Sequence, residues 1–280
     1  MTLKQTLGRS REILTASNIE DAPLEGELLL RHILELSRVQ LYLDLDNELN
    51  PEQEETFWQL IRRRLNGEPA AYITGHCEFY GIDFSVNASV LIPRPESELL
   101  VEKAVSRAQN QAVATIAEIG TGCGAIAISL ALNLPEVKIY ATDISTPALE
   151  VALSNCQKHG LADRIRLLQG DLLDPLPEPV DLIVANLPYV KKTEIDTKNF
   201  EPQLALNGGS DGLDKIRQLC RQLNDKLLPE GCLLLEIGEG QRRTVTTLLR
   251  SLFPSAQIEV TPDLSGIDRM ASLILPSATT

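Results

Sequence analysis

Hydrophobic residues recur at helical spacing through the first 70 residues of the chain, and this pattern predicts a helical domain. Residues 24–36 are dense in leucine, with charged residues between them. Pro51 begins a further helical stretch that runs to Leu65, because proline suits the first turn of a helix. Gly67 follows it, and glycine readily adopts the left-handed conformation that ends helices. We therefore expect residues 1–74 to form an N-terminal helical domain.

The pattern changes between residues 72 and 90, where apolar and polar residues partly alternate. Gly75 and Gly81 interrupt this run, which is typical of a β-hairpin. We expect residues 75–90 to be a hairpin that links two domains. A segment bracketed by Pro93 and Pro95 comes next, and then a helix around residues 99–108.

Strand-like and helix-like segments alternate through the remaining domain, residues 91–280. The candidate strands are 115–119, 138–143, 165–169, 182–185, 232–237 and 272–275. This alternation predicts an α/β fold in which helices cover both faces of a parallel sheet. Ligands bind at the carboxyl ends of the strands in such sheets. The residues that follow each strand are therefore the candidates for chemistry.

The composition excludes several classes of protein. The chain has 280 residues, 43% hydrophobic and 23% charged, and no run approaches the roughly 20 apolar residues that span a bilayer. We expect no membrane partner. The net charge of −13 repels phosphate backbones, so we expect no direct nucleic-acid binding. The five cysteines form no CxxC pair, which predicts neither a disulfide framework nor a metal site. The first residues lack the long apolar core of a signal peptide, and we expect a cytoplasmic protein.

The first strand of the sheet domain ends in a glycine-rich loop, residues 118–124. Its glycines allow a tight turn and let a ligand approach the backbone. Asp143 ends the next strand, where a carboxylate can accept hydrogen bonds from two ribose hydroxyls. Asp171 follows the third strand and could accept from an adenine amino group, while the backbone of Leu172 contacts the ring edge. The candidate cofactor-binding residues are Glu118, Gly120, Thr121, Gly122, Cys123, Gly124, Asp143, Asp171, Leu172 and Asn186.

Two cofactors compete for this loop. Gly120, Gly122 and Ala125 also fit the dinucleotide pattern G-x-G-x-x-G/A, with Asp143 at about the right distance for its ribose carboxylate. S-adenosylmethionine is favoured, because Glu118 and Gly124 fit a methyltransferase loop better and Asp171 supplies a third contact. The turn after the fourth strand adds a further argument.

That turn reads Asn186-Leu187-Pro188-Tyr189, and it predicts a site for methylating an amide nitrogen. Such a nitrogen is a poor nucleophile, because its lone pair is delocalised into the carbonyl. The Asn186 side-chain oxygen and the Leu187 carbonyl can accept hydrogen bonds from its two N–H groups. Pro188 stiffens the turn, and Tyr189 can stack on the planar amide. Asn186, Pro188 and Tyr189 are the candidate catalytic residues, and the four residues together the candidate substrate site.

The turn resembles the NPPY motif of amino-methyltransferases, and nearly the whole chain resembles the HemK-type N5-glutamine methyltransferases. The resemblance includes residues 69–75, 90–98, 118–124, 201–202, 205–206, 208–209, 211–213, 235–238 and 263–269. It departs at Leu187, where the family has proline, and at Ser97, where the family usually has threonine. Leucine keeps the carbonyl and serine keeps the hydroxyl, so we expect both functions to survive.

This resemblance implies a Rossmann-like class I methyltransferase domain with a mostly parallel seven-stranded sheet. It implies S-adenosylmethionine as cofactor and methylation of the glutamine in the Gly-Gly-Gln motif of bacterial peptide-chain release factors. In such enzymes the helical domain helps to dock the protein substrate, and Glu201-Pro202 would lie in a loop over the acceptor pocket.

Four other functions remain open on the sequence. A glutamine methyltransferase of a ribosomal protein would look similar. A DNA or RNA amino-methyltransferase shares the chemistry but would normally carry a basic surface. A catalytically idle scaffold that binds release factors would not need Asn186 and Tyr189 intact. A nicotinamide dehydrogenase would use the same glycine loop without the acceptor turn.

Overall fold

Helices make up the first part of the chain and a sheet with flanking helices makes up the second. The computed structural model describes residues 1–196 and 199–277. Contacts within the chain divide it into two units, Met1–His76 and Cys77–Thr280. Each unit has its own hydrophobic core.

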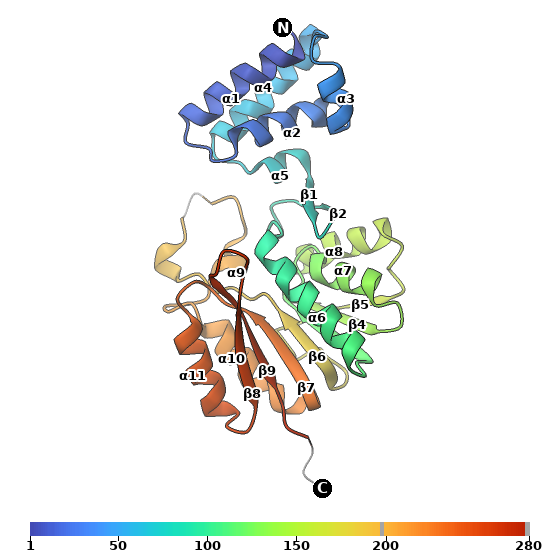
Figure 1. The fold of residues 1–280 in the computed structure, drawn as a ribbon, viewed down its shortest axis with the longest axis vertical. Helices are drawn as coiled ribbons and strands as arrows, with labels where there is room; N and C mark the ends of the chain where they lie inside the picture. Colours follow the sequence, from blue (N-terminus) through green and yellow to red (C-terminus); the bar gives the residue numbers. More distant parts are fainter. Residues whose placement is uncertain (197–198, 278–280) are drawn as a thin grey trace. The chain divides into compact units, whose positions relative to one another are not determined.

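The first unit consists of helices, drawn in shades of blue in Figure 1. They are α1 (Leu3–Ala16), α2 (Ala22–Leu34), α3 (Arg38–Leu43), α4 (Pro51–Leu65) and α5 (Ala70–Thr74). Leu14, Leu29 and Phe57 are fully buried at the centre of this unit. The helix expected from Pro51 to Leu65 is therefore present with those ends.

Local sequence fixes where three of these helices begin. Thr2, Ser37 and Asn50 each accept a hydrogen bond from the backbone of a glutamine three residues later, whose side chain bonds back. These capping boxes satisfy backbone N–H groups that the first turn leaves unpaired. Each cap stabilises its helix by about 1 kcal/mol.

The second unit contains a seven-stranded sheet with the strand order β5-β4-β3-β6-β7-β9-β8. Its strands are β3 (Thr115–Ile119), β4 (Lys138–Asp143), β5 (Ile165–Gln169), β6 (Val180–Ala185), β7 (Leu227–Glu236), β8 (Gln257–Pro262) and β9 (Asp268–Ile274). The first five of these are parallel, and β9 runs antiparallel to both β7 and β8. The expected mostly parallel, seven-stranded α/β sheet is confirmed.

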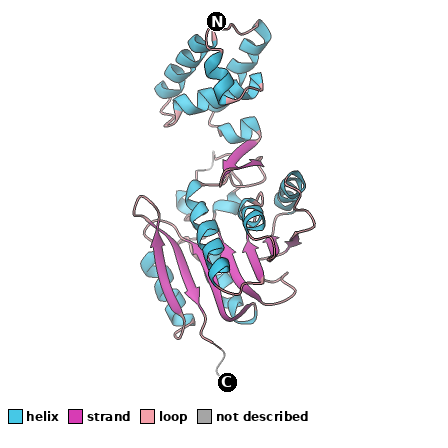
Figure 2. Ribbon diagram, turned by 45° about the vertical axis from the view of Figure 1, so that its right-hand side comes forward, coloured by secondary structure: helices cyan, strands magenta, loops and turns pink. Residues whose placement is uncertain are grey.

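Helices cover both faces of this sheet, as Figure 2 shows. The helices of this unit are α6 (Glu98–Asn110), α7 (Ala125–Asn133), α8 (Thr146–Lys158), α9 (Gln203–Leu206), α10 (Asp214–Gln222) and α11 (Arg242–Leu252), with short 3-10 turns at η1 (Pro95–Ser97), η2 (Lys192–Glu194) and η3 (Leu223–Asp225). Ile216 of α10 and Leu249 of α11 are buried in one cluster with Ile119 and Ile183 of the central strands. None of the described helices is long and apolar enough to cross a membrane.

A two-stranded hairpin, β1 (His76–Phe79) and β2 (Ile82–Ser85), precedes the sheet. Tyr80 and Gly81 form its turn with positive φ angles of 54° and 70°, the backbone that a tight hairpin requires. Within the second unit the hairpin is held in place by Glu98, which accepts a hydrogen bond of 2.8 Å from the Tyr80 N–H. The fully buried Asn155 exchanges hydrogen bonds with the backbone of Ser85, at 2.8 and 2.9 Å.

Candidate active site

The glycine loop between β3 and α7 forms one wall of a cavity at the carboxyl ends of the strands. Gly120, Gly122 and Gly124 have φ angles of 75°, 54° and 85°, which side chains other than glycine rarely adopt. A Cβ on Gly124 would also meet Ile128 at 3.3 Å and Ala152 at 3.4 Å. The loop therefore needs glycine for its backbone shape at these positions, and Gly124 also for close packing. Gly120, Thr121, Gly122 and Cys123 line the cavity, and Gly124 is the N-cap residue of α7.

Glu118, at the end of β3, is a buried carboxyl group on the same cavity. Its Oε2 accepts hydrogen bonds from the Thr121 hydroxyl at 2.6 Å and the Ala127 N–H at 2.9 Å. Burial raises the pKa of Glu118 to about 8. A cation that entered the cavity would favour the ionised form of this group.

Asp143 ends β4 and faces the cavity with a fixed orientation. Its Oδ2 accepts a hydrogen bond from the Gly122 N–H, and its Oδ1 accepts one from the Ser145 N–H, both at 2.9 Å. Each carboxylate oxygen can accept more than one hydrogen bond. Asp143 can therefore hold the glycine loop and still receive hydroxyl donors from a ligand.

Asp171 and Leu172 follow β5 and also line the cavity. The Asp171 carboxylate pairs with Lys215 of α10 at 3.1 Å and accepts a hydrogen bond from Gln218. Leu172 adopts a φ of 52°, and its carbonyl accepts a hydrogen bond of 3.0 Å from the Thr142 hydroxyl. Asp171 is thus partly neutralised by a lysine that the sequence pattern does not identify, and Lys215 itself reaches the cavity wall.

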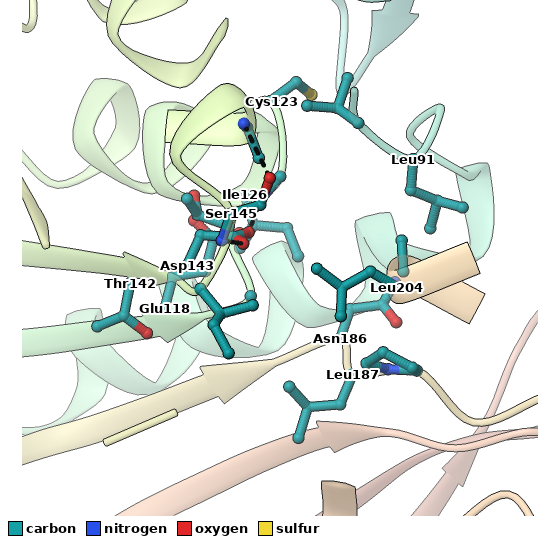
Figure 3. Close-up of a pocket in the computed structure, with 18 of the residues that line it drawn as sticks. Leu91, Glu118, Cys123, Ile126, Thr142, Asp143, Ser145, Asn186, Leu187 and Leu204 are labelled. Carbon is teal, nitrogen blue, oxygen red and sulfur yellow. Dashed lines mark hydrogen bonds between the residues drawn. The ribbon is translucent and has the colours of Figure 1, made fainter. Parts of the chain in front are cut away.

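The acceptor turn follows β6 and packs directly on the glycine loop. A Cβ on Gly120 would lie 3.4 Å from the Leu187 side chain and 3.5 Å from the Asn186 carbonyl oxygen. Asn186, Leu187 and Pro188 line the same cavity as Glu118 and Asp143. In Figure 3 Asn186 and Leu204 lie on the right of the cavity, with Glu118 and Asp143 on the left. The two predicted sites are therefore parts of a single cavity.

The Asn186 side chain has one end fixed. Its Nδ2 donates a hydrogen bond of 2.8 Å to the Ser97 hydroxyl, which in turn donates one of 2.6 Å to Oε2 of Glu236. Glu236 ends β7 and is buried. Burial raises the pKa of Glu236, while the hydrogen bonds from Ser97 and Tyr189 act in the opposite direction.

Tyr189 lies beside the cavity and is not among the described residues that line it. Its hydroxyl donates a hydrogen bond of 3.1 Å to Oε1 of Glu236, and its carbonyl accepts one of 3.1 Å from the Gln241 side chain. The ring packs on Gly238, where a Cβ would approach it to 3.1 Å. Burial raises the pKa of the Tyr189 hydroxyl. Stacking of Tyr189 on a substrate amide stays a prediction.

A loop from residue 199 to α9 covers the acceptor side of the cavity, and Pro202, Leu204 and Ala205 line it. Glu201 anchors this loop, because its buried carboxylate accepts hydrogen bonds from the Ile92 N–H at 3.1 Å and from Arg94 at 2.6 Å. Leu91 and Pro93 lie on the wall formed by that segment. The entrance beside Asn186 is therefore mostly apolar.

Sequence reasoning identified the residues at the strand ends but not those that support them. Lys215, Glu236 and Asn155 were given no role. Asn155 donates a hydrogen bond of 2.9 Å to the Cys123 carbonyl and so supports the glycine loop from behind. No local signal singles out Asn155, because its neighbours Ser154, Gln157 and Lys158 are also polar.

Neither a metal cluster nor a disulfide is found among the described residues. In the ranges 1–196 and 199–277, no group of three or more His, Cys, Asp or Glu side chains could hold a metal ion. The five cysteines are free thiols.

The parallel sheet, the glycine turn after β3, the carboxylate after β4 and the polar turn after β6 define a Rossmann-like class I methyltransferase. Residues 95–205 match the methyltransferase small domain, and residues 5–75 match the PrmC N-terminal domain. Solved structures agree on the fold of the second part. A ribosomal protein L11 methylase from Lactobacillus delbrueckii subsp. bulgaricus aligns with a TM-score of 0.51 at 22% identity, over 69% of this chain and 84% of that one. The human Mettl16 catalytic domain aligns with a TM-score of 0.57 at 15% identity, over 72% and 78%.

Sequence relatives identify the family. The release factor glutamine methyltransferase of Moorella thermoacetica is 45% identical over 96% of this chain and 97% of its own length. That of Geobacter sulfurreducens is 38% identical over 96% and 95%. This chain belongs to the family of release factor glutamine methyltransferases.

Proposed function

We propose that this protein transfers a methyl group from S-adenosylmethionine to the side-chain nitrogen of a glutamine in peptide-chain release factors, the glutamine of their Gly-Gly-Gln motif. The observation that carries this proposal is the common cavity of Asp143 and Asn186. It brings the carboxylate proposed to hold the nucleoside and the turn proposed to bind the amide to one space. We also propose the cytoplasm, where release factors act, as its place of action.

The residues of the glycine loop fit the cofactor. Asp143 is oriented by two backbone N–H groups and keeps lone pairs for ribose hydroxyls. Glu118 provides a buried acid that a cationic ligand would ionise, and the backbone of Gly120 and Gly122 on the cavity wall allows close approach. When bound, S-adenosylmethionine supplies an electrophilic methyl group.

The acceptor turn prepares the glutamine nitrogen. The Asn186 Oδ1 accepts a hydrogen bond from one N–H of the substrate amide, and the Leu187 carbonyl accepts one from the other. These acceptors hold the nitrogen in place and increase its electron density. Methylation leaves the nitrogen positively charged, and it then loses one proton, so no strong base is required. Leu91 and Leu204 add apolar side chains to the cavity wall, which we propose disfavours water near the acceptor nitrogen.

The helical unit is proposed to dock the release factor. Residues 1–74 have a core of their own and contribute no residue to the cavity. A chain that begins near Tyr72 should bind S-adenosylmethionine but methylate an intact release factor poorly. Full activity of that shortened chain would contradict the docking role.

The proposed substrate is tested by offering labelled S-adenosylmethionine and several acceptors to the full chain. A purified release factor should incorporate label, whereas ribosomal proteins, duplex DNA and RNA should not. Preferential labelling of a ribosomal protein or a nucleic acid would contradict the proposal that a release factor is the substrate. The Asn186→Ala variant serves as the control for contaminating activity.

A further inference from the structure

We propose that Glu236, acting through Ser97, determines which end of the Asn186 amide faces the acceptor cavity. Glu236 and Ser97 would then be positioning residues for methyl transfer. This inference rests on the proposed function, because it assigns their purpose to the acceptor role of the Asn186 oxygen.

The three groups form a continuous chain of hydrogen bonds from three separate parts of the sequence. Ser97 comes from the η1 turn before α6, Asn186 from the end of β6 and Glu236 from the end of β7. The bonds measure 2.8 Å from Asn186 to Ser97 and 2.6 Å from Ser97 to Glu236. Ser97 is 3% exposed and Glu236 2%, so both are largely shielded from bulk solvent, and Ser97 also lines the cavity.

The direction of these bonds follows from the carboxylate. Both Glu236 oxygens accept hydrogen bonds, Oε2 from Ser97 and Oε1 from Tyr189, and a hydroxyl has a single proton to donate. Once the Ser97 proton is directed to Glu236, only the lone pairs of Ser97 remain to face Asn186. They select the Nδ2 end of the amide, and Oδ1 is thereby left for the cavity.

Shape alone would not make this choice, because the two ends of an asparagine amide are nearly equal in size. In the reversed orientation Oδ1 would meet the lone pairs of Ser97, and Nδ2 would present N–H groups to the N–H groups of the substrate. Both contacts are repulsive. The hydrogen-bond chain therefore preorganises the acceptor that the reaction needs.

The same carboxylate also holds the second acceptor-site side chain. Its other oxygen, Oε1, accepts the 3.1 Å hydrogen bond from Tyr189. One buried group thus fixes the Asn186 amide through Ser97 and the Tyr189 ring directly. Neither Ser97 nor Glu236 needs to touch the reacting atoms for this role.

The activity test uses Ser97→Ala, with Ser97→Thr as the matched variant that keeps a hydroxyl. Ser97→Ala should lower kcat at least ~10-fold, with the release-factor KM and the S-adenosylmethionine Kd little changed, and Ser97→Thr should restore the rate. Glu236→Gln should lower kcat in the same way, because its amide can donate where the carboxylate only accepted. In an Asn186→Ala background, Ser97→Ala should have no further effect, since its influence passes through Asn186. Thermal unfolding identifies any variant that has lost its fold.

The second test needs no activity. In the 15N-labelled full chain, the Asn186 side-chain NH2 signals are assigned by their absence in Asn186→Ala. Their exchange with solvent should be at least ~10-fold faster in Ser97→Ala than in the wild type or Ser97→Thr, because a hydrogen bond is lost.

Equal exchange in Ser97→Ala and wild type would overturn the hydrogen-bond chain. Equal kcat for those two proteins, or an additive loss in the Asn186→Ala background, would overturn its role in positioning. If the wild type does not methylate a release factor, the proposed function fails, while the exchange measurement still decides whether Ser97 orients Asn186.

Discussion

Replacing Asp143 with alanine should weaken S-adenosylmethionine binding by on the order of 100-fold. The carboxylate is expected to accept hydrogen bonds from two ribose hydroxyls, and bonds to charged groups contribute about 1.5–3 kcal/mol each. Asp143 is half-buried, so water would replace part of the lost hydrogen bonding in the alanine variant. A net loss of about 3 kcal/mol corresponds to roughly 100-fold in Kd.

The structure adds a second contribution to this loss. Asp143 also accepts the 2.9 Å hydrogen bonds from Gly122 and Ser145, so alanine would loosen the glycine loop as well. Asp143→Asn keeps one acceptor oxygen and should bind about tenfold more weakly than the wild type, an intermediate loss.

Isothermal titration calorimetry of the full chain measures these affinities. Asp163→Ala is the matched control, because it removes the same charge from an exposed position away from the cavity wall. A folded Asp143→Ala protein that binds as tightly as Asp163→Ala would refute the ribose role.

Three further predictions concern the groups around the acceptor turn and the glycine loop. Asn186→Ala should reduce the rate of single-turnover methyl transfer by about 100–1000-fold with cofactor affinity nearly unchanged, because one preorganised polar contact is lost. Near-normal turnover would show that the acceptor site is elsewhere. Tyr189→Phe should lower the methylation rate only a few-fold and Tyr189→Ala much more, because phenylalanine keeps the ring on Gly238 and loses only the hydrogen bond to Glu236. Equal losses in kcat would mean that the hydroxyl is essential. The folded chain keeps Glu118 protonated up to about pH 8, whereas the unfolded chain releases this proton near pH 4.5. The free energy of unfolding should therefore fall as the pH rises between these two values, by at most about 1.4 kcal/mol per pH unit. Denaturant unfolding across that range should show a weaker decline for Glu118→Gln, and identical pH profiles would contradict the raised pKa.

The sheet could be predicted from sequence where its strands are buried on both faces. The central strands around Ile119 and Ile183 are mostly apolar, each with one acidic residue (Glu118 and Asp181), and their predicted ends lie within a few residues of the observed ones. The strand β8 was not predicted. It lies at the sheet edge and is only half-buried, so its side chains alternate without a strong apolar signal.

The residues of the candidate site fall into two groups, those that their position along the chain identifies and those that only the fold brings to the site. Gly120, Gly122 and Asp143 follow strands directly, so position along the chain was enough to group them at one edge of the sheet. The partners of Asn186 were not accessible to this reasoning, because Ser97 is 89 residues away from it and Glu236 is 139 residues from Ser97. Only the folded chain brings these hydroxyl, amide and carboxyl groups together.

Tyr189 shows a further limit. Its place in the acceptor turn predicts a ring that faces the substrate, and this stays a prediction. The structure adds that its hydroxyl bonds to Glu236, while Asn186, Leu187 and Pro188 line the cavity. A turn motif predicts which residues are near a site but not which way each side chain points.

Mass spectrometry of a release factor incubated with this protein and S-adenosylmethionine tests the central claim most directly. The peptide that contains the Gly-Gly-Gln motif should gain the mass of one methyl group, and fragmentation should place it on the glutamine side chain. A release factor with asparagine in place of that glutamine should gain no methyl group. An unmodified motif peptide, or a methyl group on another residue, would contradict the account.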